Sequence, residues 1–367
     1  MQGDCRGPRA ATASIAPLLL ALLLEGCGEA GPPLPPEESI VVPPGGEVVV
    51  YVEAARHTAG PILSSFTQQS GVEVRAVYRE TIGAAFDAML QKDAAAGKVD
   101  LLWAETPLSA MEMVEEGLAV PFRPVGARPV PSQYHDPQFR WVGFAVNPRI
   151  IMFNTDLVRR EDAPRSLQDL VRAPWGGRAA VARIARGTPA FHAAALYSLW
   201  GAERAGAFFD RIRSNGNLIV EDDAAVRRAI TSGKAAWGFL DLDEAIGAQR
   251  DAEPVHSFFP DRLAIGAIAT PQAMVLLRGA PHPLQAKGLF AFLFSVDSAY
   301  QLSGNDRPLI TLLPNVPKPD WVPNLGAINI TVIDNAAVFA AYRAHLDAFQ
   351  SWGAAGPGVR AARSPDP

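Results

Sequence analysis

Apolar residues recur along the chain with two alternating periods, one typical of strands and one typical of helices. Apolar, β-branched or alternating runs predict strands over residues 47–52, 73–78 and 99–103. Between them, apolar residues at helical spacing predict two helices, one around Ile62, Leu63 and Phe66 and one around Phe86, Met89 and Leu90. A third helix ends at Gly117. This order predicts an α/β fold with a mostly parallel sheet covered on both faces.

The same pattern begins again after residue 150. We predict strands at 178–182, 218–220, 235–240, 255–259 and 272–277, and helices at 188–200, 203–212, 223–231, 242–249 and 283–294. Two long extended runs, near 143–154 and 263–273, are suited to cross between two α/β lobes. We therefore expect lobe 1 to comprise 47–145 plus 270–352, and lobe 2 to comprise 146–269. No repeat of fixed period is present.

The two ends of the chain differ in composition from the rest. Arg6 and Arg9 precede an apolar run at 15–24, and Leu24-Glu25-Gly26-Cys27 follows. This predicts a lipoprotein signal peptide over 1–27 that ends at a lipidated Cys27, although an ordinary signal peptide with an incidental cysteine would share most of these features. A Pro/Gly-rich tether over 28–46 and a loose tail over 353–367 are expected at the two ends. The expected location is periplasmic or cell-surface, with a lipid anchor on the membrane.

Composition narrows the class of protein. The hydrophobic fraction of 49% and the charged fraction of 19% are typical of globular proteins, and the net charge of −5 without a basic stripe argues against nucleic acid as a partner. Both cysteines precede residue 30, so the remainder has no thiol chemistry and no disulfide. We find no nucleophile turn, phosphate loop or dinucleotide fingerprint. A binding protein without a cofactor is therefore expected, rather than an enzyme.

Ligands of open α/β sheets bind beyond the carboxyl ends of the strands. This rule selects candidates in both lobes: Glu53, Arg56, Arg79, Thr81 and Glu105, then Arg183, Arg186, Gly187, Thr188, Asp241, Asp243 and Glu244. His192, on a predicted helix near the cleft, is a further candidate. Each of them could instead be a helix cap or a solvated turn residue, because turns favour these residue types.

Two of these groups suggest opposite charge preferences. The run Arg186-Gly187-Thr188-Pro189 places free backbone donors and arginines at a helix start, which suits an anion, or merely a well-capped helix. Asp241, Asp243 and Glu244 would suit a cationic group or a hard metal ion, although Asp241 could be a helix N-cap. His192 lies on the inner face of its predicted helix and could equally be a packed histidine.

An ordered series of short segments resembles a known family. Tyr51, Pro61-Ile62-Leu63 and Phe66 begin the series, which continues through Asp100-Leu101-Leu102-Trp103, Trp141-Val142-Gly143-Phe144, Trp175-Gly176-Gly177 and Gly279-Ala280-Pro281-His282-Pro283. Over about 47–315 the chain resembles the ferric-iron-type periplasmic binding proteins of ABC importers. The resemblance implies a type II fold with two lobes and two hinge strands, a ligand between the lobes, a monomeric protein, and an ABC permease with its ATPase as partner.

One departure from the family bears on the ligand. Iron-binding members carry two adjacent tyrosines where this chain has Asp241-Leu242-Asp243-Glu244, and no adjacent tyrosines occur in the sequence. The leading hypothesis is an importer's binding protein for a small ion, a phosphorylated or phosphonate compound, or a zwitterion. The alternatives are a metal carrier with a changed ligand set, a secreted hydrolase that uses His192, and a sensor lipoprotein.

Overall fold

The computed structural model describes residues 33–353. The predicted signal peptide with Cys27 and the predicted tail after Gly353 lie outside these residues. Within them, no helix is both long enough and apolar enough to cross a membrane.

Lobe 1 is built on three parallel strands: β2 (Glu47–Val52), β3 (Glu73–Tyr78) and β4 (Leu101–Ala104). Helices α1 (Arg56–Ser70), α3 (Phe86–Ala95) and α4 (Pro107–Glu115) connect and cover them, and the short helix α2 (Arg79–Ile82) follows β3. Strands β2 and β4 are almost wholly buried, because in this architecture both faces of the sheet are covered. The predicted strand and helix order of lobe 1 is confirmed.

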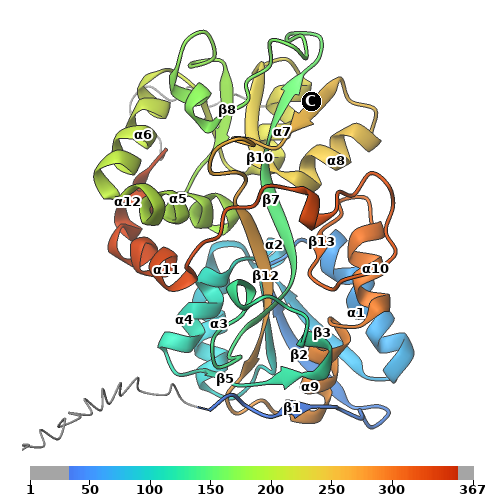
Figure 1. Ribbon diagram of the computed structural model, residues 1–367. Coiled ribbons are helices and arrows are strands. Elements are labelled where there is room, and N and C mark those ends of the chain that lie inside the picture. The colour runs from blue at the N-terminus through green and yellow to red at the C-terminus, as the bar shows by residue number, and fades with distance from the viewer. Residues whose placement is uncertain (1–32, 354–367) are drawn as a thin grey trace, which may run out of the picture. The chain divides into compact units, whose positions relative to one another are not determined.

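Two long antiparallel strands connect the lobes. Strand β7 (Val142–Asn154) pairs through its first half with β12 (Ala269–Leu277) and β13 (Ile310–Thr311), and through its second half with the strands of lobe 2. Figure 1 shows β7 running from one group of strands to the other. Every residue of β7 and of β12 is buried, as expected of strands shared by two cores.

Lobe 2 has the parallel strands β8 (Ala179–Ala182), β9 (Leu218–Val220) and β10 (Trp237–Asp241), with β11 (Val255–Phe258) antiparallel to β7. Its helices are α5 (Gly187–Trp200), α6 (Ala202–Ser214), α7 (Asp223–Thr231) and α8 (Leu242–Arg250). The sheets are mixed, since the strands that cross between lobes run antiparallel to their neighbours in both.

The C-terminal part differs from the sequence-based assignment of 270–352 to lobe 1. Helices α9 (Pro283–Phe292) and α10 (Val296–Gly304) do pack in lobe 1, against β12 and α1 respectively. The chain then crosses a third time, and α11 (Asn335–Ala344) and α12 (Leu346–Ser351) lie beside α5 and α6 (Figure 1). Val338, Phe349 and Trp352 are buried there, and Trp352 Nε1 donates to the Phe209 carbonyl at 3.2 Å. Apolar residues on these two helices thus complete the core of lobe 2.

Candidate functional site

Side chains from both lobes meet beside the crossing strand β7, at the carboxyl ends of the parallel strands. Glu105 follows β4 in lobe 1, and Gly187 begins α5 in lobe 2; a β carbon added to Gly187 would lie 3.0 Å from Glu105 Oε2. Asn147 of β7 donates to Asp243 of α8 at 2.9 Å. We refer to this region as the interlobe site, and its residues are Glu53, Glu105, Asn147, Arg149, Gly187, Thr188, Asp223, Asp241, Asp243 and Glu244.

Glu53 organises the lobe 1 side. Its buried carboxylate accepts from Arg79 Nη2 at 2.5 Å, from the Glu105 backbone N–H at 2.9 Å and from Ser109 Oγ at 2.6 Å. Arg79 also pairs with Asp87 at 2.6 Å and stacks on the Phe86 ring. Glu53 and Arg79 therefore neutralise each other and fix the loop that presents Glu105.

Arg56 and Thr81, both predicted site residues, lie together on an exposed part of lobe 1. Arg56 Nη2 donates to Thr81 Oγ1 at 3.3 Å, and its Nε pairs with Glu80 at 3.2 Å. The guanidinium also covers the Tyr78 ring at 4.0 Å. These contacts place both residues in a local surface cluster of lobe 1.

Arg149 of β7 is the central cation of the site. Its side chain is only 2% exposed, and it donates to Asp223 at 2.8 and 3.0 Å, to Asp241 at 3.0 Å and to the Phe239 carbonyl at 3.1 Å. A longer contact of 3.3 Å reaches Thr188 Oγ1. Arg149 thus ties the crossing strand to β10, α5 and α7.

Burial is the main influence on the pKa values of the aspartates near Arg149. Burial raises the pKa of Asp241 well above its usual range; Arg149 opposes this shift, while Asp223 and Asp243 add to it. Burial likewise raises the pKa of Asp243, despite the hydrogen bonds that it accepts from Asn147 and from the Glu244 backbone N–H. Asp241 occupies an N-cap position, but its side chain makes no capping bond, so its contact with Arg149 is its main role here.

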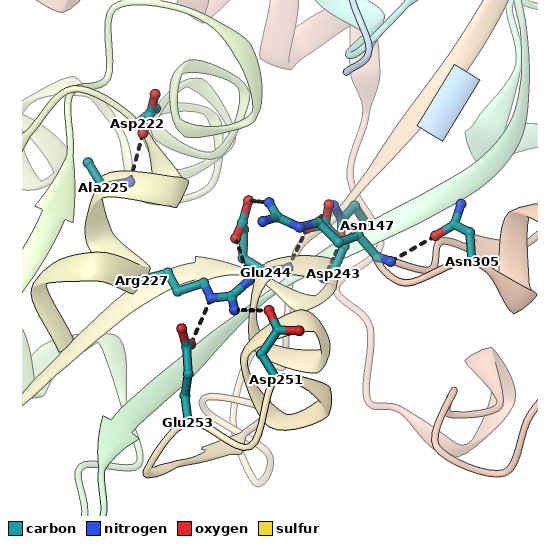
Figure 2. A network of polar contacts seen from close by, with 10 residues as sticks. Asn147, Asp222, Ala225, Arg227, Asp243, Glu244, Asp251, Glu253 and Asn305 are labelled. Carbon is teal, nitrogen blue, oxygen red and sulfur yellow. Dashed lines mark hydrogen bonds and ion pairs between the residues drawn. The ribbon is translucent and has the colours of Figure 1, made fainter. Parts of the chain in front are cut away.

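Glu244, on the first turn of α8, lies between two arginines. Arg307 Nη1 donates to its Oε1, whereas Arg227 Nη1 is 3.7 Å from its Oε2. Figure 2 shows that Arg227 also pairs with Asp251 and Glu253, at hydrogen-bonding distance. Burial raises the pKa of Glu244 to about 7, with Asp243 adding to the shift and Arg307 opposing it.

The start of α5 carries two arginines that the sequence suggests as donors to an anion. Arg183 and Arg186 both pair with Glu221, at 3.1 and 3.8 Å. The acidic group near Gly187 is Glu105 of the other lobe. Burial raises the pKa of Glu105 to about 7, with Glu53 adding to the shift and Arg79 opposing it.

His192, on the second turn of α5, is a buried and neutral histidine. Its ring centroid lies 4.7 Å from that of Phe239. Burial, and to a lesser extent the nearby charge of Arg149, lowers the pKa of His192 well below the usual value. Its Nε2 makes no hydrogen bond with the described part of the chain. Among residues 33–353, no three His, Cys, Asp or Glu side chains converge in a geometry that could hold a metal ion.

Comparison with known proteins decides the family. The model of the family described as "Bacterial extracellular solute-binding protein" matches residues 98–326. The chain belongs to this family. The predicted resemblance to ferric-binding-type solute-binding proteins is confirmed, and so is the role that it implies, which is that of a solute-binding component of an ABC importer.

Individual relatives have low sequence identity to this chain. Iron uptake protein A1 of Synechocystis is 24% identical over 312 residues, which cover 80% of this chain and 83% of that protein. The Fe(3+)-binding periplasmic protein of Serratia marcescens is 23% identical over 194 residues, or 53% of this chain and 56% of that protein.

Solved structures share the fold. Iron-bound HitA from Pseudomonas aeruginosa has a TM-score of 0.75 at 17% identity, covering 84% of this chain and 99% of that chain. AfuA from Actinobacillus pleuropneumoniae, with exogenous fructose-6-phosphate bound, has a TM-score of 0.72 at 15% identity, covering 84% and 98%. The predicted two-lobe type II fold is confirmed by these similarities.

Some residues of the interlobe site of this solute-binding protein were missed from sequence. Arg149 and Asn147 were treated only as part of an apolar crossing run, and Asp223 only as a helix start. The sequence did contain a signal for them. Asn147 and Arg149 stand within a run of mainly apolar residues that is typical of a buried strand. A charged residue in such a strand requires a buried partner of opposite charge. Arg307 carried no comparable signal, since it lies in a polar turn.

Proposed function

We propose that this solute-binding protein captures a small solute bearing a positively charged group at the interlobe site and delivers it to an ABC permease driven by its ATPase. One observation carries the charge assignment. Asp223 and Asp241 pair with the buried cation Arg149, Asp243 lies near them, and the pKa values of Asp241 and Asp243 are raised.

The pKa values of these carboxyl groups are raised chiefly by burial, and the nearby cations do not offset this effect on the ionised forms. A cationic group placed among them would recover Coulomb energy that the solute-free protein does not have. The same binding step would lower these pKa values and release protons. An isolated anion would face the opposite balance, because it would approach Glu105, Asp241 and Asp243 together.

Lobe closure follows from where the residues lie. Glu105 belongs to lobe 1, whereas Asp241, Asp243 and Glu244 belong to lobe 2. A solute that contacts both groups stabilises the closed arrangement by its differential affinity for it. Such binding needs no catalytic step, and we propose a non-enzymatic role.

A metal carrier with a changed ligand set is the second candidate. It is favoured by the names of two relatives, which refer to iron, and by the carboxylate oxygens of the site, which suit hard cations. Without adjacent tyrosines, we expect no intense phenolate-to-iron colour on adding ferric citrate. A coloured stoichiometric complex would favour this candidate over an organic cation.

The location is proposed from the sequence together with the family. The family is described as extracellular. We propose that Cys27 carries the lipid that holds this protein at a membrane. Cys27→Ser should move the protein from the membrane fraction to the soluble extracytoplasmic fraction. Retention of the variant in washed membranes would contradict the proposed anchor.

A thermal-shift screen tests the charge of the solute. Putrescine, choline and aminomethylphosphonate serve as cation-bearing probes, with phosphate as an anion probe. We expect a cation-bearing probe to raise Tm with concentration and phosphate alone to leave it unchanged. Asp243→Asn should then weaken affinity roughly tenfold to a hundredfold, because a charge-assisted contact is lost.

The matched control for that variant is Asp306→Asn. Asp306 is 92% exposed and pairs with Arg250, so its change should leave affinity within about twofold. Stabilisation by phosphate alone, strengthened by Asp243→Asn, would overturn the cationic assignment and favour an anionic solute.

A further inference from the structure

The side chain of Arg307 reaches from one lobe to the other. It follows α10 in lobe 1, where Asn305 Oδ1 accepts from its backbone N–H at 2.9 Å, and the chain continues into β13. Its guanidinium nevertheless reaches α8 of lobe 2 and donates to Glu244. The Arg307 side chain is 30% exposed and that of Glu244 is 10% exposed, so a partly solvated cation neutralises a buried acid.

Glu244 has unused capacity to accept a hydrogen bond. Its Oε2 is buried and accepts no hydrogen bond from the described residues. Arg227 is too distant to donate to it and is engaged by Asp251 at 2.5 Å and by Glu253 at 2.8 Å (Figure 2). Arg307 is therefore its only direct donor within 33–353.

The surface of α8 is shaped for this guanidinium. Gly247 lies one turn beyond Glu244, and a β carbon there would be 3.4 Å from Arg307 Cγ and 3.0 Å from Arg227 Nη1. Glycine inside a helix is less favourable than alanine. Here its missing side chain leaves the room that the two arginines occupy.

We infer that Arg307 occupies the position that the positively charged group of the solute takes, so that a solute must displace it. This inference rests on the proposed function. Arg307 is then a specificity-determining residue: a cation is retained only if it satisfies Glu244 and Asp243 better than the protein's own guanidinium. Once displaced by the solute, the Arg307 side chain no longer contacts α8 and stays with the lobe 1 turn that holds its backbone.

The same two segments supply a matched control. Arg250 of α8 pairs with Asp306, the residue before Arg307, at 2.9 Å. This pair also bridges the two lobes, but Asp306 is 92% exposed and leaves no buried acid behind. Arg250→Ala therefore removes a cross-lobe ion pair without creating a vacant cation position.

The test is chemical rescue with methylguanidinium as the probe. In Arg307→Ala, we expect millimolar methylguanidinium to give a saturable rise in Tm of about 1–3 °C. The wild-type protein, Arg250→Ala and Arg307→Lys should show no such rise. In each of them the side chain at position 307 still occupies the cation position beside Glu244. The double variant Arg307→Ala/Glu244→Gln should lose the rescue, which assigns the bound cation to Glu244.

The outcomes separate this inference from the proposed function. Absence of rescue in a folded Arg307→Ala, or equal rescue of Arg250→Ala, would overturn the inference even if the wild type binds cationic solutes. Rescue combined with wild-type binding of phosphate alone would leave the cation position standing and overturn the proposed solute charge. Rescue of Arg307→Ala that persists after Glu244→Gln would also overturn the inference.

Discussion

A single buried arginine accounts for much of how the interlobe site is held. Arg149 lies in a strand whose other residues are buried, and it loses its hydration on folding. Desolvation of a charge costs several kcal/mol, and it is offset only by close partners with good geometry. Asp223, Asp241 and the Phe239 carbonyl provide these partners. The arginine and its two aspartates therefore behave as one unit, in which no member can be removed alone without cost.

Arg149→Met should lower the free energy of unfolding by about 3–5 kcal/mol, because Asp223 and Asp241 would remain buried without their cation. Urea unfolding at neutral pH measures the change. Arg186→Ala is the control: its side chain is 61% exposed and its pair with Glu221 is long, so its effect should stay below about 1 kcal/mol. Equal effects of the two variants would contradict the proposed role of Arg149.

Helices α4 and α11 form a second junction between the lobes. Helix α4 belongs to lobe 1, whereas α11 packs on α5 of lobe 2, and Arg343 Nε lies 3.5 Å from Glu115 Oε2. Burial raises the pKa of the neighbouring Glu112 to about 7; Glu53 and Asp87 add to the shift, and Arg343 opposes it. A carboxyl group that titrates near neutrality therefore lies at this helix contact.

Glu112 should make stability fall as pH rises from about 4.5 to about 7, because over this range the folded state retains a proton that the unfolded state has lost. Glu112→Gln removes this dependence. Relative to the wild type, the variant should therefore gain about 1–2 kcal/mol between pH 5 and pH 8. Denaturant unfolding at both pH values measures the gain, with the exposed Glu116→Gln as control. A difference from wild type that is constant with pH would refute the assignment.

At the scale of the whole molecule, the chain crosses between the two lobes three times within residues 33–353. Strands β7 and β12 make the first two, and the segment between β13 and α11 makes the third. The third crossing carries Val338, Phe349 and Trp352 into the core of lobe 2. The C-terminal helices are consequently part of lobe 2, and any hinge motion between the lobes must also bend this third connection.

Phe349→Ala should destabilise the protein by about 3–5 kcal/mol, because a fully buried ring is replaced by a cavity. Hydrogen exchange should increase in α5 and α6, on which the ring packs, and not in α1 of lobe 1. Tyr300→Ala, at a position that is 54% exposed on α10, is the control and should change little. Increased exchange confined to lobe 1 would assign the C-terminal helices to the other lobe.

The sequence by itself determined the elements whose burial is periodic. The predicted strands at 73–78 and 218–220 and the helix at 223–231 coincide with β3, β9 and α7. Apolar residues recur in each at the spacing of a strand or a helix, so its own residues report its structure. The ordered series of motifs likewise identified the family, because a binding protein's lobes and crossing strands follow one another along the chain.

Only the tertiary structure decided which charges meet. Arg149 finds Asp223 and Asp241 at separations of 74 and 92 residues, and Arg307 finds Glu244 at 63. Arg183 and Arg186 turn to Glu221, while Glu105 reaches Gly187 from the other lobe. Periodicity reveals which side of an element is buried, but not which element covers it. Partners so far apart in sequence depend on the strand order and on the third crossing, which no local pattern encodes.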